Sequence, residues 1–169
     1  NQKFDNIENV REFLINSSSF LHVLNKIEKK PSKKSPQAAF TTSTLQQEAS
    51  RKLSFSVNRT MSVAQKLYEQ GLITYMRTDS TNLSKTAVDS IKDLVANKYG
   101  SSFFTERTYQ TKSKGAQEAH EAIRPTDFNF IKIDNDNDQN KLYRLIWERA
   151  VASQMSDAKI ERTTYKVNS

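Results

Sequence analysis

Two side chains that could act together on a phosphate ester lie in segment 72–81, directly after a glycine. Tyr75 and Arg77 stand two positions apart, so in an extended chain they point to one side. Thr74 and Met76 then point to the other side. A guanidinium can bind two phosphate oxygens while a phenolic oxygen faces phosphorus. Phenol has a reference pKa of about 10, so a cationic neighbour such as Arg77 is needed before the nucleophilic phenolate forms.

The same segment also has a structural interpretation. Tyr-x-Arg spacing is common, and residue types alone favour a strand in which Tyr75 packs into a core. Arg77 would then pair with Asp79. The two interpretations differ in whether the phenol is exposed or buried.

Helical patterns flank the segment. Upstream, overlapping capping boxes, Ser43 with Gln46 and Thr44 with Gln47, predict the start of a helix. Apolar residues continue at helical spacing to Leu53, so the helix is predicted to cover three turns.

The helix that directly precedes Tyr75 is predicted over about 58–70. Its apolar stripe consists of Met61, Ala64, Leu67 and Tyr68. Gly71 fits the position after its end, where a left-handed conformation is favoured. A third helix is predicted between Ser84 and Gly100, and a fourth over about 139–155.

Both ends of the chain have the composition of strands. Segments 19–27 and 159–167 are rich in strand-forming residues, and a breaker with two prolines predicts a linker near 30–38. Segment 128–133 is predicted to be a buried strand or a return segment. Two strand-like ends around a helical middle predict an inserted domain whose neighbour is a β-rich sheet.

Composition restricts the classes of function. The chain has 169 residues, 26 Lys and Arg against 19 Asp and Glu, a net charge of +7 and a pI near 9.5. This charge favours polyanionic partners. The lysine run 26–34 is interpreted first as a solvated strand end and loop. Because the chain has no Cys, it can contain no disulfide, thiolate metal site or cysteine nucleophile.

Targeting signals are not recognised in the sequence. No apolar run approaches the roughly 18 residues of a membrane span, so no membrane partner is expected. The chain begins at Asn1, which we interpret as the start of an excised piece of a longer intracellular protein.

Segment 71–80, Gly-Leu-Ile-Thr-Tyr-Met-Arg-Thr-Asp-Ser, resembles the active-site signature of the type IA DNA topoisomerases at ten consecutive positions. Two further segments are similar to blocks of this family: Phe-Thr-Thr-Ser-Thr-Leu-Gln-Gln-Glu-Ala at 40–49 and Glu-Ala-His-Glu-Ala-Ile-Arg-Pro at 118–125. Ala39 stands where the family usually has proline. The order and spacing of the three blocks agree with the family over residues 39–125.

The resemblance implies a role for each matching residue. Tyr75 is implied to attack a single-stranded DNA phosphodiester, which leaves a 5′-phosphotyrosine and a free 3′-hydroxyl. Arg77 is implied to hold the scissile phosphate, and His120 to hydrogen-bond near it, although a structural histidine is the alternative. The remaining candidates are Asp79, implied to position His120 or Arg77; Thr74, Gln65 and Glu69, implied to shape the pocket and the strand path; and Arg124, implied to make a structural or DNA-backbone contact.

The resemblance also implies an architecture. The expected fold is α+β and mostly helical, with a winged-helix or CAP-like domain carrying the tyrosine inserted between strands of a partial arch domain. The expected boundaries are 1–38 for the first arch part, 39–127 for the helical domain and 128–169 for the returning helix and strand.

The family resemblance further implies the cofactor and partners. The intact enzyme is expected to bind Mg²⁺ through acidic residues of an N-terminal domain, and neither this domain nor a metal site is found in this sequence. The partners are this domain and single-stranded or negatively supercoiled DNA, in the cytoplasm with the nucleoid. The piece alone is expected not to relax DNA.

Other interpretations remain open from the residues. The charge and the helical middle also fit a non-enzymatic DNA-binding module. Met76 argues against a relative of topoisomerase III or reverse gyrase. Segment 134–138 resembles the start of a calcium loop, but Gln139 replaces the required glycine, which favours a solvated acidic loop.

Overall fold

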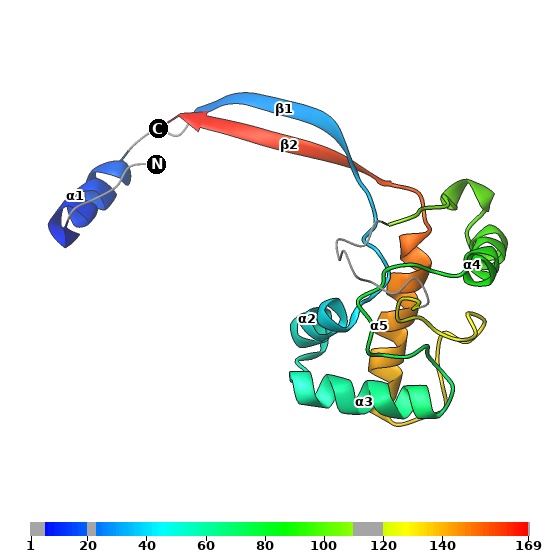
Figure 1. Cartoon of the computed structure of the whole chain (residues 1–169). Coiled ribbons are helices and arrows are strands. Elements are labelled where there is room, and N and C mark those ends of the chain that lie inside the picture. Colours follow the sequence, from blue (N-terminus) through cyan, green and yellow to red (C-terminus); the bar gives the residue numbers. More distant parts are fainter. Residues whose placement is uncertain (1–5, 20–22, 110–119, 169) are drawn as a thin grey trace. The chain divides into compact units, whose positions relative to one another are not determined.

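The computed structural model describes residues 6–19, 23–109 and 120–168 and has an α+β fold (Figure 1). The elements are α1 (Ile7–Ser17), β1 (Val23–Lys34), α2 (Thr42–Leu53), α3 (Val57–Glu69), α4 (Lys85–Lys98), the 3₁₀ turn η1 (Ser101–Phe103), α5 (Asn137–Ser153) and β2 (Ala158–Asn168). The chain forms two compact units. The ribbon unit comprises residues 1–34 and 159–169, and the helical unit comprises residues 35–158.

The ribbon unit contains the two predicted terminal strands, which pair with each other. β1 and β2 run in opposite directions as a two-stranded sheet (Figure 1). β1 continues through Pro31 to Lys34, so the linker begins after Lys34, later than the predicted start near residue 30. Proline is tolerated there because every strand of a two-stranded sheet is an edge strand. The same unit contains α1, which the sequence analysis did not predict.

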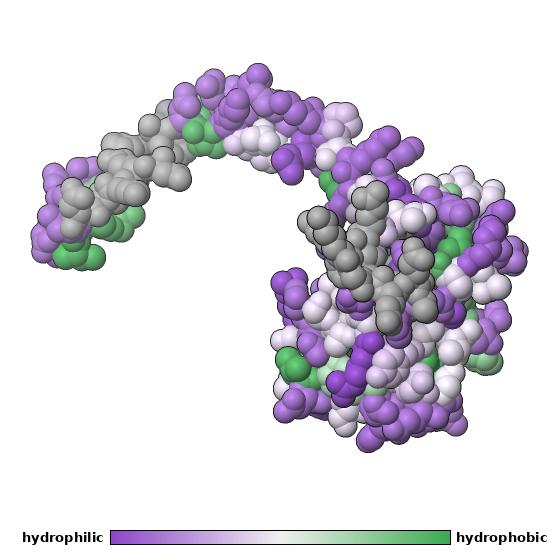
Figure 2. Space-filling model, viewed as in Figure 1, coloured by the Kyte–Doolittle hydropathy of each residue, from purple (hydrophilic) through white to green (hydrophobic). Residues whose placement is uncertain are grey.

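Most of the net charge lies on this ribbon. β1 and β2 together have eight Lys or Arg side chains and two Glu side chains, a net +6 of the chain's +7. Ion pairs between the strands join Lys166 to Glu28 at 2.9 Å and Lys29 to Glu161 at 3.1 Å. Because side chains alternate along a strand, the face with Glu28 has a net charge of +4. The basic residues of this cationic face are Lys26, Lys30, Lys34, Arg162 and Lys166. Figure 2 shows most of the ribbon surface as hydrophilic.

The core of the helical unit lies where α5 packs against α2 and α3. Buried side chains of α5 include Leu142, Ile146 and Trp147, which join Leu45 of α2 and Leu67 of α3 in one cluster. The predicted boundary at 127–128 is therefore misplaced, because the apolar face of α5 belongs to this core and residues 128–158 to the helical unit. Segment 128–133 forms turns and bends, not a strand.

Helix ends confirm part of the capping analysis. The cap of α2 is Thr41, two or three residues before the predicted caps: Thr41 and Thr44 each bond the other's backbone N–H through the hydroxyl. Ser84 caps α4 as predicted. Asp136, from the acidic segment considered as a calcium loop, caps α5 by accepting from the Gln139 N–H at 2.8 Å.

The end of α3 determines where segment 72–81 begins. Gly71 has φ +71° and follows the C-cap Gln70, as predicted. Its N–H donates to the Tyr68 carbonyl at 2.8 Å, and the Leu72 N–H donates to the Leu67 carbonyl at 2.9 Å. These two bonds form a Schellman motif, which ends the helix and redirects the chain.

No helix in the described ranges 6–19, 23–109 and 120–168 is long and apolar enough to cross a membrane.

Gly71→Ala tests the left-handed turn. A Cβ at Gly71 would meet no atom within 4 Å, so the penalty comes from φ alone. We expect the free energy of unfolding to fall by about 1–2 kcal/mol, measured by urea denaturation. Gly71→Asn is the matched control and should lose less, because asparagine tolerates this conformation. Equal stability of the Ala variant and the unmodified chain would contradict the assignment.

Candidate functional site

Side chains of segment 75–80 alternate between solvent and core. Tyr75 is 42% exposed, and Arg77 and Asp79 are also exposed. Met76, Thr78 and Ser80 are buried. Tyr75 and Arg77 therefore share the solvent side, as the two-residue spacing predicts, and the interpretation of Tyr75 as a core residue is wrong.

Segment 75–80 lies outside the named strands, so partners from elsewhere bind its backbone. On one side is Thr42, in the first turn of α2. The Thr42 N–H donates to the Thr78 carbonyl at 2.9 Å, and the Thr42 hydroxyl donates to the Met76 carbonyl at 2.8 Å. The Thr78 N–H donates back to that hydroxyl at 2.9 Å. These bonds hold the backbone on both sides of Arg77.

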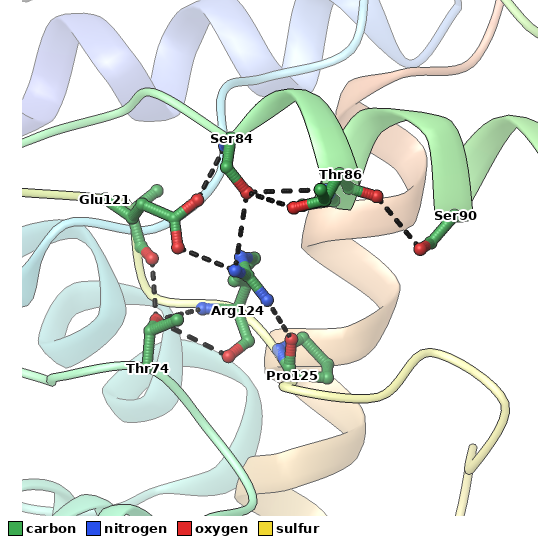
Figure 3. Close-up of polar contacts among 9 residues, drawn as sticks. Thr74, Ser84, Thr86, Ser90, Glu121, Arg124 and Pro125 are labelled. Atoms are coloured by element: carbon green, nitrogen blue, oxygen red, sulfur yellow. Dashed lines mark hydrogen bonds and ion pairs between the residues drawn. The ribbon is translucent and has the colours of Figure 1, made fainter.

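Thr74 attaches the segment to residues 122–125 (Figure 3). Its N–H donates to the Arg124 carbonyl at 2.9 Å, and its hydroxyl accepts from the Arg124 N–H at 3.0 Å. The hydroxyl donates to the Ala122 carbonyl at 2.7 Å. Ile73 forms an antiparallel bridge with Pro125, and the Ile123 N–H donates to the Phe40 carbonyl at 2.8 Å. The described parts of all three family-like blocks thus meet through hydrogen bonds.

The Arg124 side chain is largely buried and bound within the protein (Figure 3). Its guanidinium forms an ion pair with Glu121 at 2.6 Å and donates to the Pro125 carbonyl at 2.9 Å. The second Glu121 oxygen accepts from the Ser84 N–H at 2.6 Å, at the start of α4. These contacts agree with the structural role considered for Arg124. A DNA contact by this residue stays a prediction.

Glu121 is charged at neutral pH. Burial raises the pKa of its carboxyl, but hydrogen bonds from Ser84 and Arg124 together outweigh burial and hold the pKa below its ordinary value. The ionised Glu121 carboxylate therefore stabilises the folded state at pH values above the ordinary pKa of a glutamate. This stabilisation is lost as the pH falls through the lowered pKa of Glu121.

The α3 side of the site contains Gln65 and Glu69, one helical turn apart. The Gln65 amide donates to the Glu69 carboxylate at 2.7 Å. Tyr68, which the sequence analysis assigned to the apolar stripe, is 40% exposed and contacts the Tyr75 ring, with centroids 5.3 Å apart. The contact between Tyr68 and Tyr75, which lie seven positions apart in the sequence, was not predicted. Helical periodicity describes α3 alone and does not include the turn at Gly71 that brings Tyr75 back to the helix.

His120 is exposed and stands directly before Glu121. Ala122 and Arg124, two and four positions later in the chain, form hydrogen bonds with Thr74 of the tyrosine segment. Residues 118 and 119 of the family-like block, directly before His120, lie outside the described residues.

A metal centre is not found among residues 6–19, 23–109 and 120–168, which hold no group of three His, Cys, Asp or Glu side chains able to bind an ion. In the acidic segment 134–138, Asp138 forms an ion pair with Arg59 at 2.6 Å. These residues do not fit Mg²⁺ coordination, so no chemical step is assigned to a metal here.

Glu121→Gln tests the polar network. We expect the variant to lose about 1–2 kcal/mol of unfolding free energy at pH 7, because the charged hydrogen bonds to Ser84 and Arg124 weaken. The loss should shrink as the pH falls through the lowered pKa of Glu121, where the carboxylate of the unmodified chain takes up a proton. Denaturation at several pH values measures this. Glu106→Gln, at an exposed position, is the control for the same charge change. A loss independent of pH would contradict the role of charge.

Comparisons with known proteins identify the family. A family model described as DNA topoisomerase matches residues 1–169. DNA topoisomerase 1 of Zymomonas mobilis is 52% identical over 143 residues, and that of Streptomyces coelicolor is 55% identical over 146 residues. Each match covers 83% of this chain, but only 12% and 15% of the respective relatives.

A solved structure agrees with the sequence matches. Full-length topoisomerase I of Thermotoga maritima is similar with a TM-score of 0.75 and 36% identity, over 99% of this chain and 28% of that chain. The present chain spans less than a third of the length of each of these three proteins. It belongs to the bacterial type IA DNA topoisomerase family.

Proposed function

We propose that this chain supplies the nucleophile of a type IA DNA topoisomerase, and that this nucleophile is Tyr75. The observation that carries the proposal is the exposed phenol beside the exposed guanidinium of Arg77, on a segment whose backbone is bound on both sides. A buried phenol could not reach a DNA strand.

The proposed reaction is a transesterification. The Tyr75 Oη attacks phosphorus, a P–Oη bond forms, and the bond from phosphorus to the 3′ oxygen breaks. The phenol loses its proton and the 3′ oxygen gains one, which leaves a 5′-phosphotyrosine and a 3′-hydroxyl. Religation reverses each change.

Energy balance explains why no ATP is needed. One phosphodiester replaces another, so the bond energy is roughly conserved through cleavage and religation. The covalent link holds the broken end, so resealing is effectively intramolecular. Passage of the other strand through the gap would relax negative supercoils, driven by the strain in the DNA itself.

The neighbouring side chains receive distinct roles in this proposal. Arg77 binds the scissile phosphate and stabilises the negative charge that develops on it. His120 hydrogen-bonds near that phosphate, and Asp79 positions one of these two residues. Supporting roles in shaping the pocket and the strand path fall to Thr74, Gln65 and Glu69.

The proposed architecture follows the two units. The helical unit is the tyrosine-bearing, winged-helix-like domain, and the paired strands are part of an arch into which it is inserted. A separate N-terminal domain of the full polypeptide would cover the site and supply Mg²⁺. The chain alone is then inactive in relaxation.

Tyr75→Phe tests the nucleophile in a full-length polypeptide that contains this segment. We expect cleavage and relaxation to be abolished, because phenylalanine has no oxygen to form the phosphate ester. The measurements are gel assays of relaxation and of covalent protein–DNA adducts. Tyr99→Phe, at another exposed tyrosine, is the control and should stay active. Adduct formation by the Tyr75 variant would show that another residue attacks.

The charge distribution supports DNA as the partner and leads to a second test. Replacing Lys26, Lys30 and Lys34 of the cationic face by Gln should weaken binding of this chain to DNA. The slope of log affinity against log salt should fall by about 0.7 for each single-strand phosphate that the variant no longer neutralises. Fluorescence anisotropy with a labelled oligonucleotide over a salt series measures both.

The matched control replaces three exposed lysines of the helical unit, Lys92, Lys132 and Lys141, which changes the net charge equally. Its salt slope should remain near that of the unmodified chain. Equal slopes for the two triple variants would mean that only the overall charge matters and that the ribbon has no specific part in binding.

A further inference from the structure

The rings of Tyr68 and Tyr75 form an aromatic pair at the surface. Their centroids are 5.3 Å apart and their planes meet at 65°, an edge-to-face arrangement. The two side chains are 40% and 42% exposed. Neither ring is buried, so the contact holds two side chains that would otherwise sample several rotamers in water.

The backbone under both rings is bound in place. The Tyr68 carbonyl accepts the Gly71 N–H, the bond that turns the chain out of α3. Thr74, directly before Tyr75, bonds to Ala122 and Arg124. The Cα positions of both tyrosines are therefore set by hydrogen bonds that do not involve either ring. What the ring contact adds is the direction of the Tyr75 side chain.

We infer that Tyr68 is a positioning residue for the nucleophile Tyr75. This inference rests on the proposed function of Tyr75. An exposed phenol attacks efficiently only from the rotamer that aims Oη at phosphorus, and populating that rotamer before DNA binds avoids part of the orientation cost. Edge-to-face pairing with Tyr68 stabilises the paired rotamer of Tyr75 relative to its other rotamers and so raises the population of that rotamer.

The contact is made by the rings, so the Tyr68 hydroxyl is not required. Tyr68→Phe keeps the edge-to-face pair, and Tyr68→Leu removes it while keeping an apolar side chain of similar reach. Both changes are at a position with 40% exposure, so neither opens a cavity in the core. The two variants therefore form a matched pair that separates the ring from the hydroxyl and from folding.

The first experiment measures the ring contact in this chain by NMR, with carbon-13-labelled tyrosine. The Tyr75 ring signals are assigned by their loss in Tyr75→Phe. We expect Tyr68→Phe to keep the ring-current shift of these signals and Tyr68→Leu to move them toward the values of a free tyrosine. Unchanged Tyr75 signals in Tyr68→Leu would overturn the inference, whatever the function of Tyr75.

The second experiment measures single-turnover cleavage of an oligonucleotide by a full-length polypeptide that contains this segment. Tyr68→Leu should slow cleavage by about 2- to 12-fold, and Tyr68→Phe should cleave at the rate of the unmodified protein. The dissociation constant for the oligonucleotide should stay the same in both variants. A change in binding with an unchanged cleavage rate would overturn the inference, because it would show that Tyr68 contacts DNA instead of positioning Tyr75.

The two proposals fail in different ways. If Tyr75→Phe still formed the covalent adduct, the proposed function would fall, although the NMR result would stand as a ring contact. If Tyr75→Phe were inactive and Tyr68→Leu cleaved at the normal rate, only the positioning role of Tyr68 would fall.

Discussion

The hydrogen bonds of Thr74 join the tyrosine segment to residues 48 and 50 positions further along the chain. The segment belongs to no sheet, so its polar backbone groups need partners from other parts of the helical unit. Thr74 takes part in four such bonds on one side of Tyr75, and Thr42 takes part in four on the other side, around Arg77. The exposed phenol and the exposed guanidinium keep a fixed spacing because the backbone beside them, at Thr74, Met76 and Thr78, is held by these bonds.

This arrangement explains how a residue can be both exposed and ordered. Side chains that face inward, such as Met76, pack in the core, and those that face outward, such as Tyr75, remain accessible to solvent. The Schellman motif at Gly71 brings the chain out of α3 so that Tyr75 returns to the last turn of that helix. Glu121 and Arg124 then tie the opposite segment to the start of α4. The end of α3 thus positions the tyrosine segment, and the start of α4 positions the segment that contains Glu121 and Arg124.

The ribbon and helical units differ in how they use charge. Nearly all of the net charge belongs to β1 and β2, where the side chains are exposed and the strands have few apolar partners. In the helical unit, positive and negative side chains are nearly balanced in number, and some form ion pairs, as in Arg59 with Asp138 and Arg107 with Asp157. An unpaired excess of one sign attracts polyanions over a distance, whereas paired groups hold a local geometry. The excess positive charge of the ribbon unit therefore supports the proposed DNA partner.

Local signals in the sequence determined much of this molecule. The family blocks were identified by their resemblance to known sequences. The ends of α3 and α4 at Gly71 and Ser84, and the shared side of Tyr75 and Arg77, follow from short-range rules of spacing and capping. Three features required the tertiary structure: the inclusion of α5 in the helical core, the bonds from Thr74 to Arg124, and the exposure of Tyr68 against Tyr75. Each depends on which distant surfaces meet, and periodicity within one helix or strand contains no information about the partner that covers it.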